Sequence, residues 1–372
     1  LGKLMKSAGY TTGIFGKWGL GNPGSVSIPN KMGFDEFYGY NCQRQSHSFY
    51  PDHLWHNEEK VLFPENENNA CKTYSQDLIH EQALKFIRDH KEQPFFAMLT
   101  YTLPHAELNL PHDSIYKMYE NSFEETPYIG KFDKVYGGYN TSEKPLASFA
   151  AMVSRLDKYV GDVMAELKEL GLDKNTIVIF ASDHGETMCS QFTDDPKNSP
   201  YSESMNIPFL VRYPGHIQPR VDNLLMSAPD IMPTVLGLCG LGDSIPSNVQ
   251  GRNWAPLFFD EKAEIERPGG ALYIQNLDGE KDADGKVQTY FPSSRGYKTA
   301  RYTLAFYIDK KDHKLKKSLL FDDEKDPYQM NNLPLEENKE IVAELCREMG
   351  KELKAIDDPW YKERILSDMI PY

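Results

Sequence analysis

Segments with the periodicity of amphipathic helices alternate with short apolar runs along the first 240 residues. Residues 76–90 and 147–171 place apolar side chains on one helical face, and the apolar runs 94–102 and 176–182 follow them. Two further segments of each kind have the same features: helical patterns at 1–8 and 228–241, and apolar runs at 10–16 and 207–215. This alternation predicts an α/β fold with a mostly parallel central sheet flanked by helices.

The pattern changes after about Pro268. Residues 271–276, 298–309 and 316–322 have the composition of strands and are joined by charged segments, and a helical pattern follows at 341–356. We therefore expect two parts: a main α/β domain over residues 1–267 and a smaller C-terminal subdomain over residues 268–372. The subdomain is predicted to be a small antiparallel sheet with one helix.

Charge and composition exclude several classes of protein. The 372 residues include 41 Lys and Arg against 55 Asp and Glu, a net charge of −14, which repels nucleic acid and anionic membrane surfaces. No segment approaches the roughly 18 consecutive apolar residues of a membrane span. The five cysteines have neither the even number of a disulfide framework nor the spacing of a zinc site: Cys42, Cys71, Cys189, Cys239 and Cys346.

Polar side chains follow several of the predicted strands, where ligands of open α/β sheets bind. Asp183 and His184 come directly after one apolar run, and a carboxylate beside an imidazole suits a divalent cation. The alternative is that Asp183 caps a turn and His184 lies on the surface.

Lys17, Lys197 and His105 also stand near strand ends. If they converge, two ammonium groups and an imidazole form a pocket for a tetrahedral oxyanion, in which His105 could protonate a leaving oxygen. Taken singly, each lysine is equally consistent with a solvated surface charge, and His105 with a structural histidine.

The order of these motifs resembles the sulfatase family of the alkaline-phosphatase-like superfamily. The segment GYTTGIFGKWGLG resembles the family block G-Y-x-T-x-x-x-G-K-W-H-L-G, and FASDHGE resembles its S-D-[NH]-G metal block. Other collinear matches are GFDEFYGY, LTYTLPHAELNLP, MVSRLDKYVG, KNSPYSESMNIPFLVRYPG, APDIMPTVLGLCG, RGYKTARYTLAFY and LFDDEKDPYQMNNL. The resemblance covers essentially the whole chain.

The resemblance implies a fold like that of alkaline phosphatase and a role for each matched residue. Asp183 and His184 correspond to ligands of an active-site Ca²⁺. Lys17, His105 and Lys197 correspond to the catalytic sulfate-binding set, with His105 as proton donor to the leaving alcohol.

Two family features are missing. The formylglycine motif C/S-x-P-x-R does not occur, and none of the Asp-Asp pairs, at 194–195, 322–323 and 357–358, ends an N-terminal strand as the family's metal-binding pair does. We therefore expect the nucleophile upstream of Leu1, and we expect the chain alone to be an inactive fragment that aggregates. Gly19 stands where most members carry a histidine, which leaves His47 or His53 as the replacement base, unless both are surface histidines.

The segment after residue 43 is polar and aromatic. Arg44 and His47, with Tyr50 and Trp55, suit binding to a sugar, although an ordered loop with its own small aromatic core explains them equally well.

The resemblance thus implies a sulfate-ester hydrolase acting on a sulfated carbohydrate. The alternatives are a phosphatase or phosphonate monoester hydrolase of the same superfamily, and a non-catalytic glycan-binding homologue. Export is plausible from family habit, although the sequence has no signal peptide to show it.

Overall fold

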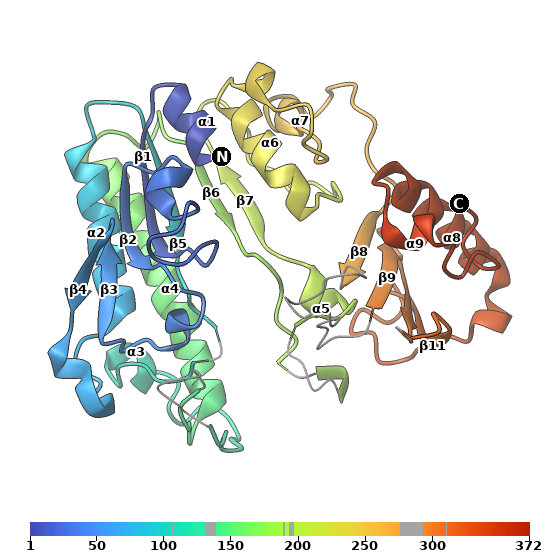
Figure 1. Cartoon of the computed structure of the whole chain (residues 1–372), viewed down its shortest axis with the longest axis horizontal. Coiled ribbons are helices and arrows are strands. Elements are labelled where there is room, and N and C mark those ends of the chain that lie inside the picture. The colour runs from blue at the N-terminus through green and yellow to red at the C-terminus, as the bar shows by residue number, and fades with distance from the viewer. Residues whose placement is uncertain (106, 131–138, 189, 193–196, 276–292, 310) are drawn as a thin grey trace. The chain divides into compact units, whose positions relative to one another are not determined.

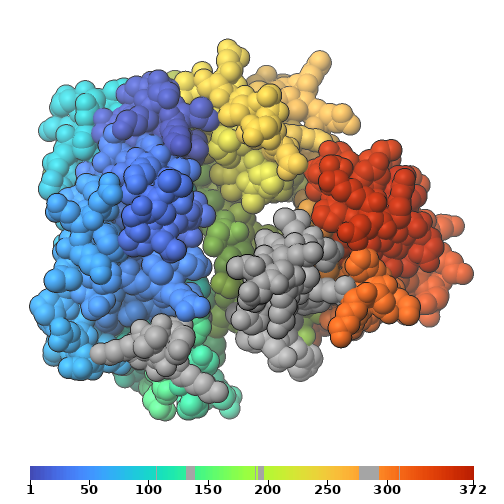
Figure 2. Space-filling model, in the orientation of Figure 1, coloured from blue at the N-terminus to red at the C-terminus, as the bar shows by residue number. Residues whose placement is uncertain are grey.

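The computed structural model describes residues 1–372 except 106, 131–138, 189, 193–196, 276–292 and 310 (Figure 1). The chain forms two compact units, Leu1–Thr176 and Ile177–Tyr372. The boundary predicted between residues 267 and 268 stays a prediction. In Figure 2, the described residues of the first unit run from blue at the N-terminus to green near residue 176.

A five-stranded mixed sheet forms the centre of the first unit, in the order β4-β3-β2-β1-β5. Strand β1 (Thr11–Lys17) pairs in parallel with β2 (Glu36–Tyr40) and β5 (Phe95–Thr100). Strands β3 (His53–His56) and β4 (Glu59–Leu62) extend it as an antiparallel hairpin. Strands β1 and β5 correspond to predicted apolar runs, whereas β2 and the hairpin lie in a stretch that was expected to be rich in loops.

The helices of the first unit are α1 (Gly2–Ser7), α2 (Ser75–Asp89), α3 (Ser114–Lys117) and α4 (Pro145–Glu169), with 3₁₀ turns η1 (Pro29–Met32), η2 (Gln45–His47) and η3 (Pro64–Asn69). Helices α1 and α2 lie against the strands of this sheet. From α2, Ile79, Ala83 and Phe86 pack with Phe15 of β1 in a buried core. Helix α4 packs on α2 and α3.

The second unit begins with β6 (Val178–Ala181) and β7 (Phe209–Arg212). These strands pair with each other in antiparallel register, Ile179 opposite Val211. The predicted sheet was only mostly parallel, and these two strands pair antiparallel. The elements near them are η4 (Ser190–Phe192), α5 (Ser202–Met205), α6 (Ala228–Leu238), η5 (Gly242–Ser244) and α7 (Ala255–Phe259).

A four-stranded antiparallel sheet completes the second unit, in the order β11-β10-β9-β8. It comprises β8 (Ala271–Gln275), β9 (Ser293–Lys298), β10 (Tyr302–Ile308) and β11 (Leu315–Asp322), and η6 (Leu335–Glu337), α8 (Lys339–Ala355) and α9 (Pro359–Lys362) follow. Leu345 and Met349 of α8 pack on Phe306 of β10. The predicted α/β class with a C-terminal antiparallel sheet plus helix is confirmed.

Within the described ranges, the helices are all too short or too polar to cross a lipid bilayer.

Candidate active site

Lys17 is the last residue of β1 and lies opposite Tyr40 of β2. Glycine at positions 16 and 39 lets the three parallel strands approach closely at this end. A Cβ on Gly16 would lie 2.0 Å from the Thr100 carbonyl oxygen, and one on Gly39 would lie 1.9 Å from the Gly16 carbonyl oxygen. Because β1, β2 and β5 are parallel, their carboxyl ends lie on the same side of the sheet, and Lys17 lies at that end of β1.

His105 lies in the loop that leaves β5, and its backbone N–H donates to the Thr102 carbonyl at 2.9 Å. Its ring stacks on His47, with centroids 5.1 Å apart and planes 16° from parallel. Tyr139 contacts both rings, at 5.8 Å from His105 and 5.4 Å from His47. The structure thus brings together two predicted site residues from loops far apart in sequence, and adds Tyr139, which no motif in the sequence indicated.

His47 and His53 are both half-buried. His53 Nδ1 lies 2.8 Å from Asp52 Oδ1, and its ring packs edge-on against Trp55. Arg44 is exposed at the start of η2, and its carbonyl accepts from His47 N–H at 3.1 Å. His47 is therefore the histidine nearer to the candidate chemistry.

Gly19 has a conformation that explains why no side chain stands there. Its φ is +70°, and a Cβ would lie 2.5 Å from Gln43 Oε1. A side chain at this position would displace only the exposed end of Gln43, so the left-handed φ is what disfavours a histidine there.

Glu107 is fully buried two residues after His105. Burial raises the pKa of its carboxyl to about 7, although the hydrogen bonds that it accepts from Asn140 and Asn109 act to lower that pKa. The Asn109 N–H donates at 3.0 Å and the Asn140 side chain at 3.2 Å. Glu107 thus connects the loop that carries His105 to the segment that carries Tyr139. The sequence carried no signal for this residue, because its burial is visible only in the structure.

Asp183 and His184 follow β6 in the second unit. Asp183 Oδ1 accepts from His184 N–H at 3.1 Å, as the turn interpretation expects, but its side chain is 83% exposed. The His184 Nδ1 lies 2.7 Å from the Gly185 carbonyl oxygen, which can only accept. In neutral His184 the proton is therefore on Nδ1, and the lone pair on Nε2 is available to a metal ion.

These two side chains fit two positions around one divalent cation. Asp183 Oδ2 and His184 Nε2 are 3.6 Å apart. Adjacent ligands of a Ca²⁺ ion, each about 2.4 Å from it, lie about 3.4 Å apart at a right angle. The separation of the two donor atoms is therefore compatible with binding to one ion. The part of the chain that the structure describes holds no group of three or more His, Cys, Asp or Glu side chains that could hold a metal.

Lys197 is half-buried in the loop that precedes α5 of the second unit, next to residues outside the described ranges. The structure therefore places the predicted residues in two sets. Lys17, Arg44, His47 and His105 belong to the first unit, and Asp183, His184 and Lys197 belong to the second.

Comparison with known proteins identifies the family. The sulfatase family model matches residues 1–241, and the model of the C-terminal part of N-sulphoglucosamine sulphohydrolase matches residues 194–357. The chain belongs to the sulfatase family. Because the chain belongs to this family, it is a sulfuric ester hydrolase.

Its relatives include glycan sulfatases. An endo-4-O-sulfatase of Bacteroides thetaiotaomicron is 53% identical over all of this chain and 76% of its own length. An ulvan-active sulfatase of Formosa agariphila is 28% identical over 96% of this chain and 66% of its own length. A solved structure from work on the metabolism of multiple glycosaminoglycans by Bacteroides thetaiotaomicron has a TM-score of 0.83 at 49% identity, covering all of this sulfatase and 79% of that chain.

Proposed function

We propose that this sulfatase hydrolyses 4-O-sulfate esters within a glycosaminoglycan chain. The observation that carries the proposal is the 53% identity with an endo-4-O-sulfatase over every residue of the chain. The solved relative connected with glycosaminoglycan metabolism supports the same class of substrate. A sulfated carbohydrate is thus the partner, and the net charge of −14 argues against nucleic acid.

His105 is proposed to protonate the leaving sugar oxygen. A sugar alkoxide is a poor leaving group, so proton transfer from a positioned imidazole lowers the barrier. The stacked ring of His47 limits the rotation of His105 and fixes the plane in which its N–H points. His47, rather than His53, is proposed as the base that replaces the histidine missing at Gly19, because its ring stacks on that of His105.

Lys17 and Lys197 are proposed to bind the sulfate oxygens as ammonium groups, which stabilises charge on these oxygens in the transition state. Arg44 is exposed at the start of η2, where its guanidinium can reach the anionic groups of a glycan. Lysine and arginine at these positions also offset locally the repulsion between an anionic substrate and the acidic protein.

Asp183 and His184 are proposed to hold a Ca²⁺ ion. When bound, the cation supplies electrostatic stabilisation of the sulfate oxygens, and the family's formylglycine, which we place outside these 372 residues, supplies the nucleophilic oxygen. The turn at residues 182–185 keeps the two ligand atoms in position, since the Ser182 hydroxyl donates to the His184 carbonyl at 2.7 Å.

The experiment that tests the function is sulfate release by the full-length protein. Size-defined, 4-O-sulfated glycosaminoglycan oligosaccharides are incubated with the protein, and free sulfate is measured by ion chromatography. We expect release from internal positions. Hydrolysis of phosphate monoesters in preference to sulfates would support the phosphatase alternative, and binding without any release would support the non-catalytic alternative.

The role of His105 predicts a dependence on the leaving group. Replacing His105 by Ala should lower kcat on a sugar sulfate by roughly 10²–10⁴-fold. The loss should be much smaller on 4-nitrophenyl sulfate, because nitrophenolate leaves without a proton.

His56→Ala is the matched control, because His56 lies on β3 with its side chain 48% exposed. This variant should keep both activities. An equal loss on the two substrates in His105→Ala would remove His105 as the acid.

A further inference from the structure

A solvent-open cavity of about 620 Å³ lies in the first unit and has no part in the proposed chemistry. Its volume is in the usual range of small-molecule sites. Three segments form its walls: the end of the loop after η2, the segment entering α2, and the loop after β5. The lining residues are Tyr50, Cys71, Lys72, Thr73, Tyr74, Asp77, Leu78, Asn109, Leu110, Pro111 and His112.

The segment that enters α2 is held rigidly by a buried asparagine. Asn66 is 4% exposed, and its Oδ1 accepts from the N–H groups of Lys72 at 2.9 Å and Thr73 at 2.8 Å. Its Nδ2 donates to the carbonyls of Pro51 and Thr73, both at 2.9 Å. Because the whole carboxamide is used, this wall has its shape before any ligand arrives, which lowers the entropic cost of binding.

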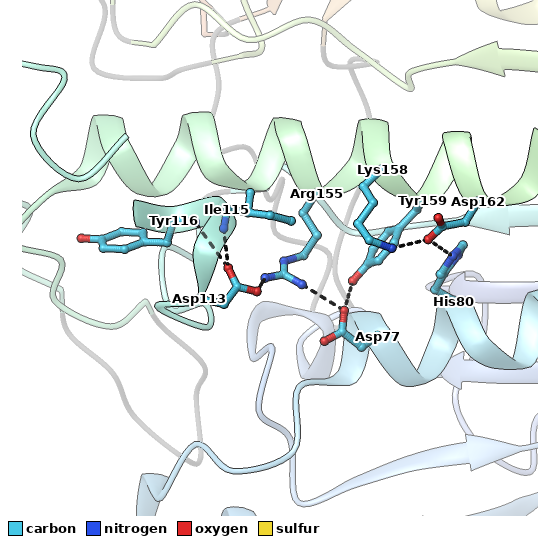
Figure 3. Close-up of polar contacts among 9 residues, drawn as sticks. All are labelled: Asp77, His80, Asp113, Ile115, Tyr116, Arg155, Lys158, Tyr159 and Asp162. Carbon is cyan, nitrogen blue, oxygen red and sulfur yellow. Dashed lines mark hydrogen bonds and ion pairs between the residues drawn. The ribbon is translucent and has the colours of Figure 1, made fainter. Parts of the chain in front are cut away.

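Asp77 offers a fixed acceptor at the wall. Its Oδ1 receives Arg155 Nη1 at 3.2 Å and the hydroxyl of Tyr159, as Figure 3 shows. Its Oδ2 has no hydrogen bond among the residues described, and the side chain is 42% exposed. One oxygen therefore orients the carboxylate and the other can accept from a ligand hydroxyl.

Tyr74 adds a polar group without a protein partner. The residue is 5% exposed, and its hydroxyl forms no hydrogen bond within the described part of the chain. The ring is fixed by the Arg155 guanidinium, 5.4 Å from its centroid, and by the Tyr50 ring at 5.2 Å. The hydroxyl itself is closed off from solvent, so Tyr74 shapes the wall and does not contact a ligand in the cavity directly.

The lining combines aromatic faces with both donors and acceptors. Tyr50 offers ring surface, Asp77 accepts, Asn109 can do both, and the exposed Lys72 brings a positive charge to the rim. Sugar rings present apolar C–H faces and hydroxyls that both donate and accept, and the lysine selects a sugar that bears a sulfate or carboxylate.

We propose that this cavity is a subsite for a second sugar of the anionic glycan, one that is not the sugar losing its sulfate. The inference rests on the proposed function. Tyr50 follows His47 by three residues, and Asn109 follows His105 by four, so the same two loops carry the stacked histidines and line the cavity. A polymer held at the histidines can extend along these loops.

The test is isothermal titration calorimetry on the full-length protein carrying His105→Ala to prevent turnover. The ligands are a 4-O-sulfated glycosaminoglycan disaccharide and the corresponding hexasaccharide. We expect the hexasaccharide to bind more tightly. Adding Tyr50→Ala, which removes an aromatic face of the wall, or Lys72→Ala should weaken hexasaccharide binding about 3- to 30-fold and leave disaccharide binding unchanged.

Lys91→Ala is the matched control, since Lys91 is exposed beyond the end of α2 and does not line the cavity. It should change neither affinity. Equal affinity of the parent for the two ligands would overturn the proposal, as would no loss, or the same loss for both ligands, in the two cavity variants. If the protein with His105 intact releases no sulfate while length-dependent binding persists, the proposed function fails and the subsite stands.

Discussion

Glu107 is a carboxyl group that the fold encloses completely beside the candidate active site. Burial raises its pKa to about 7 from an ordinary 4.5, although Asn140 and Asn109 donate hydrogen bonds to it. Between these two pH values the folded state binds more protons than the unfolded chain. The stability that Glu107 contributes is therefore fully present below about pH 4.5 and is lost as the pH rises toward 7.

Glu107→Gln tests this prediction, because glutamine cannot ionise. The wild type should lose stability relative to the variant as pH rises from about 5 to about 8, by up to roughly 3 kcal/mol. The measurement is the melting temperature of both proteins at each pH by calorimetry. A difference in melting temperature that does not change with pH would show that Glu107 is ionised throughout.

Among the elements, Arg155 of α4 joins three helices. Its side chain is 5% exposed and bonds to Asp77 of α2 and to Asp113, which caps the N-terminus of α3 (Figure 3). Burial alone would raise the pKa of Asp113, but the Arg155 hydrogen bond outweighs it and lowers that pKa. This stabilisation is present above the ordinary pKa of the carboxyl and is lost in acid.

Arg155→Met keeps most of the volume and removes the charge. We expect it to lower the free energy of unfolding by about 2–3 kcal/mol, below the range for fully buried pairs because both aspartates are partly exposed. Urea denaturation measures the loss.

The control is Lys158→Met on the same helix. Lys158 forms an exposed pair with Asp162 four residues on, so this variant should cost less than about 1 kcal/mol. Equal losses in the two variants would contradict the bridging role of Arg155.

For the whole molecule, the net charge of −14 attracts divalent cations to many places at once. A rise in melting temperature on adding Ca²⁺ is therefore not evidence for a specific site unless one pair of ligands accounts for it. Asp183 and His184 are the proposed pair, and binding to the folded state alone stabilises it in proportion to the logarithm of free cation concentration.

Asp183→Asn should abolish the saturable part of this stabilisation, and chelation of Ca²⁺ should lower both melting temperature and turnover in the wild type. Calorimetry of the full-length protein across a Ca²⁺ titration gives the result. Asp243→Asn, at an exposed position of the same unit, is the control and should melt like the wild type. If Asp183→Asn retains the whole Ca²⁺ effect, these residues are not the ligands.

The sequence by itself determined the α/β class, most helices and apolar strands, and the family. The pattern of apolar residues within a single segment predicts its secondary structure, so α2, α4 and β5 could be predicted without knowing which elements they pack against. Strand β9 was missed because it has little apolar pattern: its Arg295 is buried against Asp358 at 3.1 Å, a pair that only packing creates.

Only the tertiary structure decided which side chains meet. The stacking of His47 on His105, the contact with Tyr139, the burial of Glu107 and the cavity beside Tyr74 each join segments separated by many residues. Burial and contact are properties of the folded chain, and the energies that follow from them, such as pKa shifts and partnerless hydroxyls, have no counterpart in residue spacing.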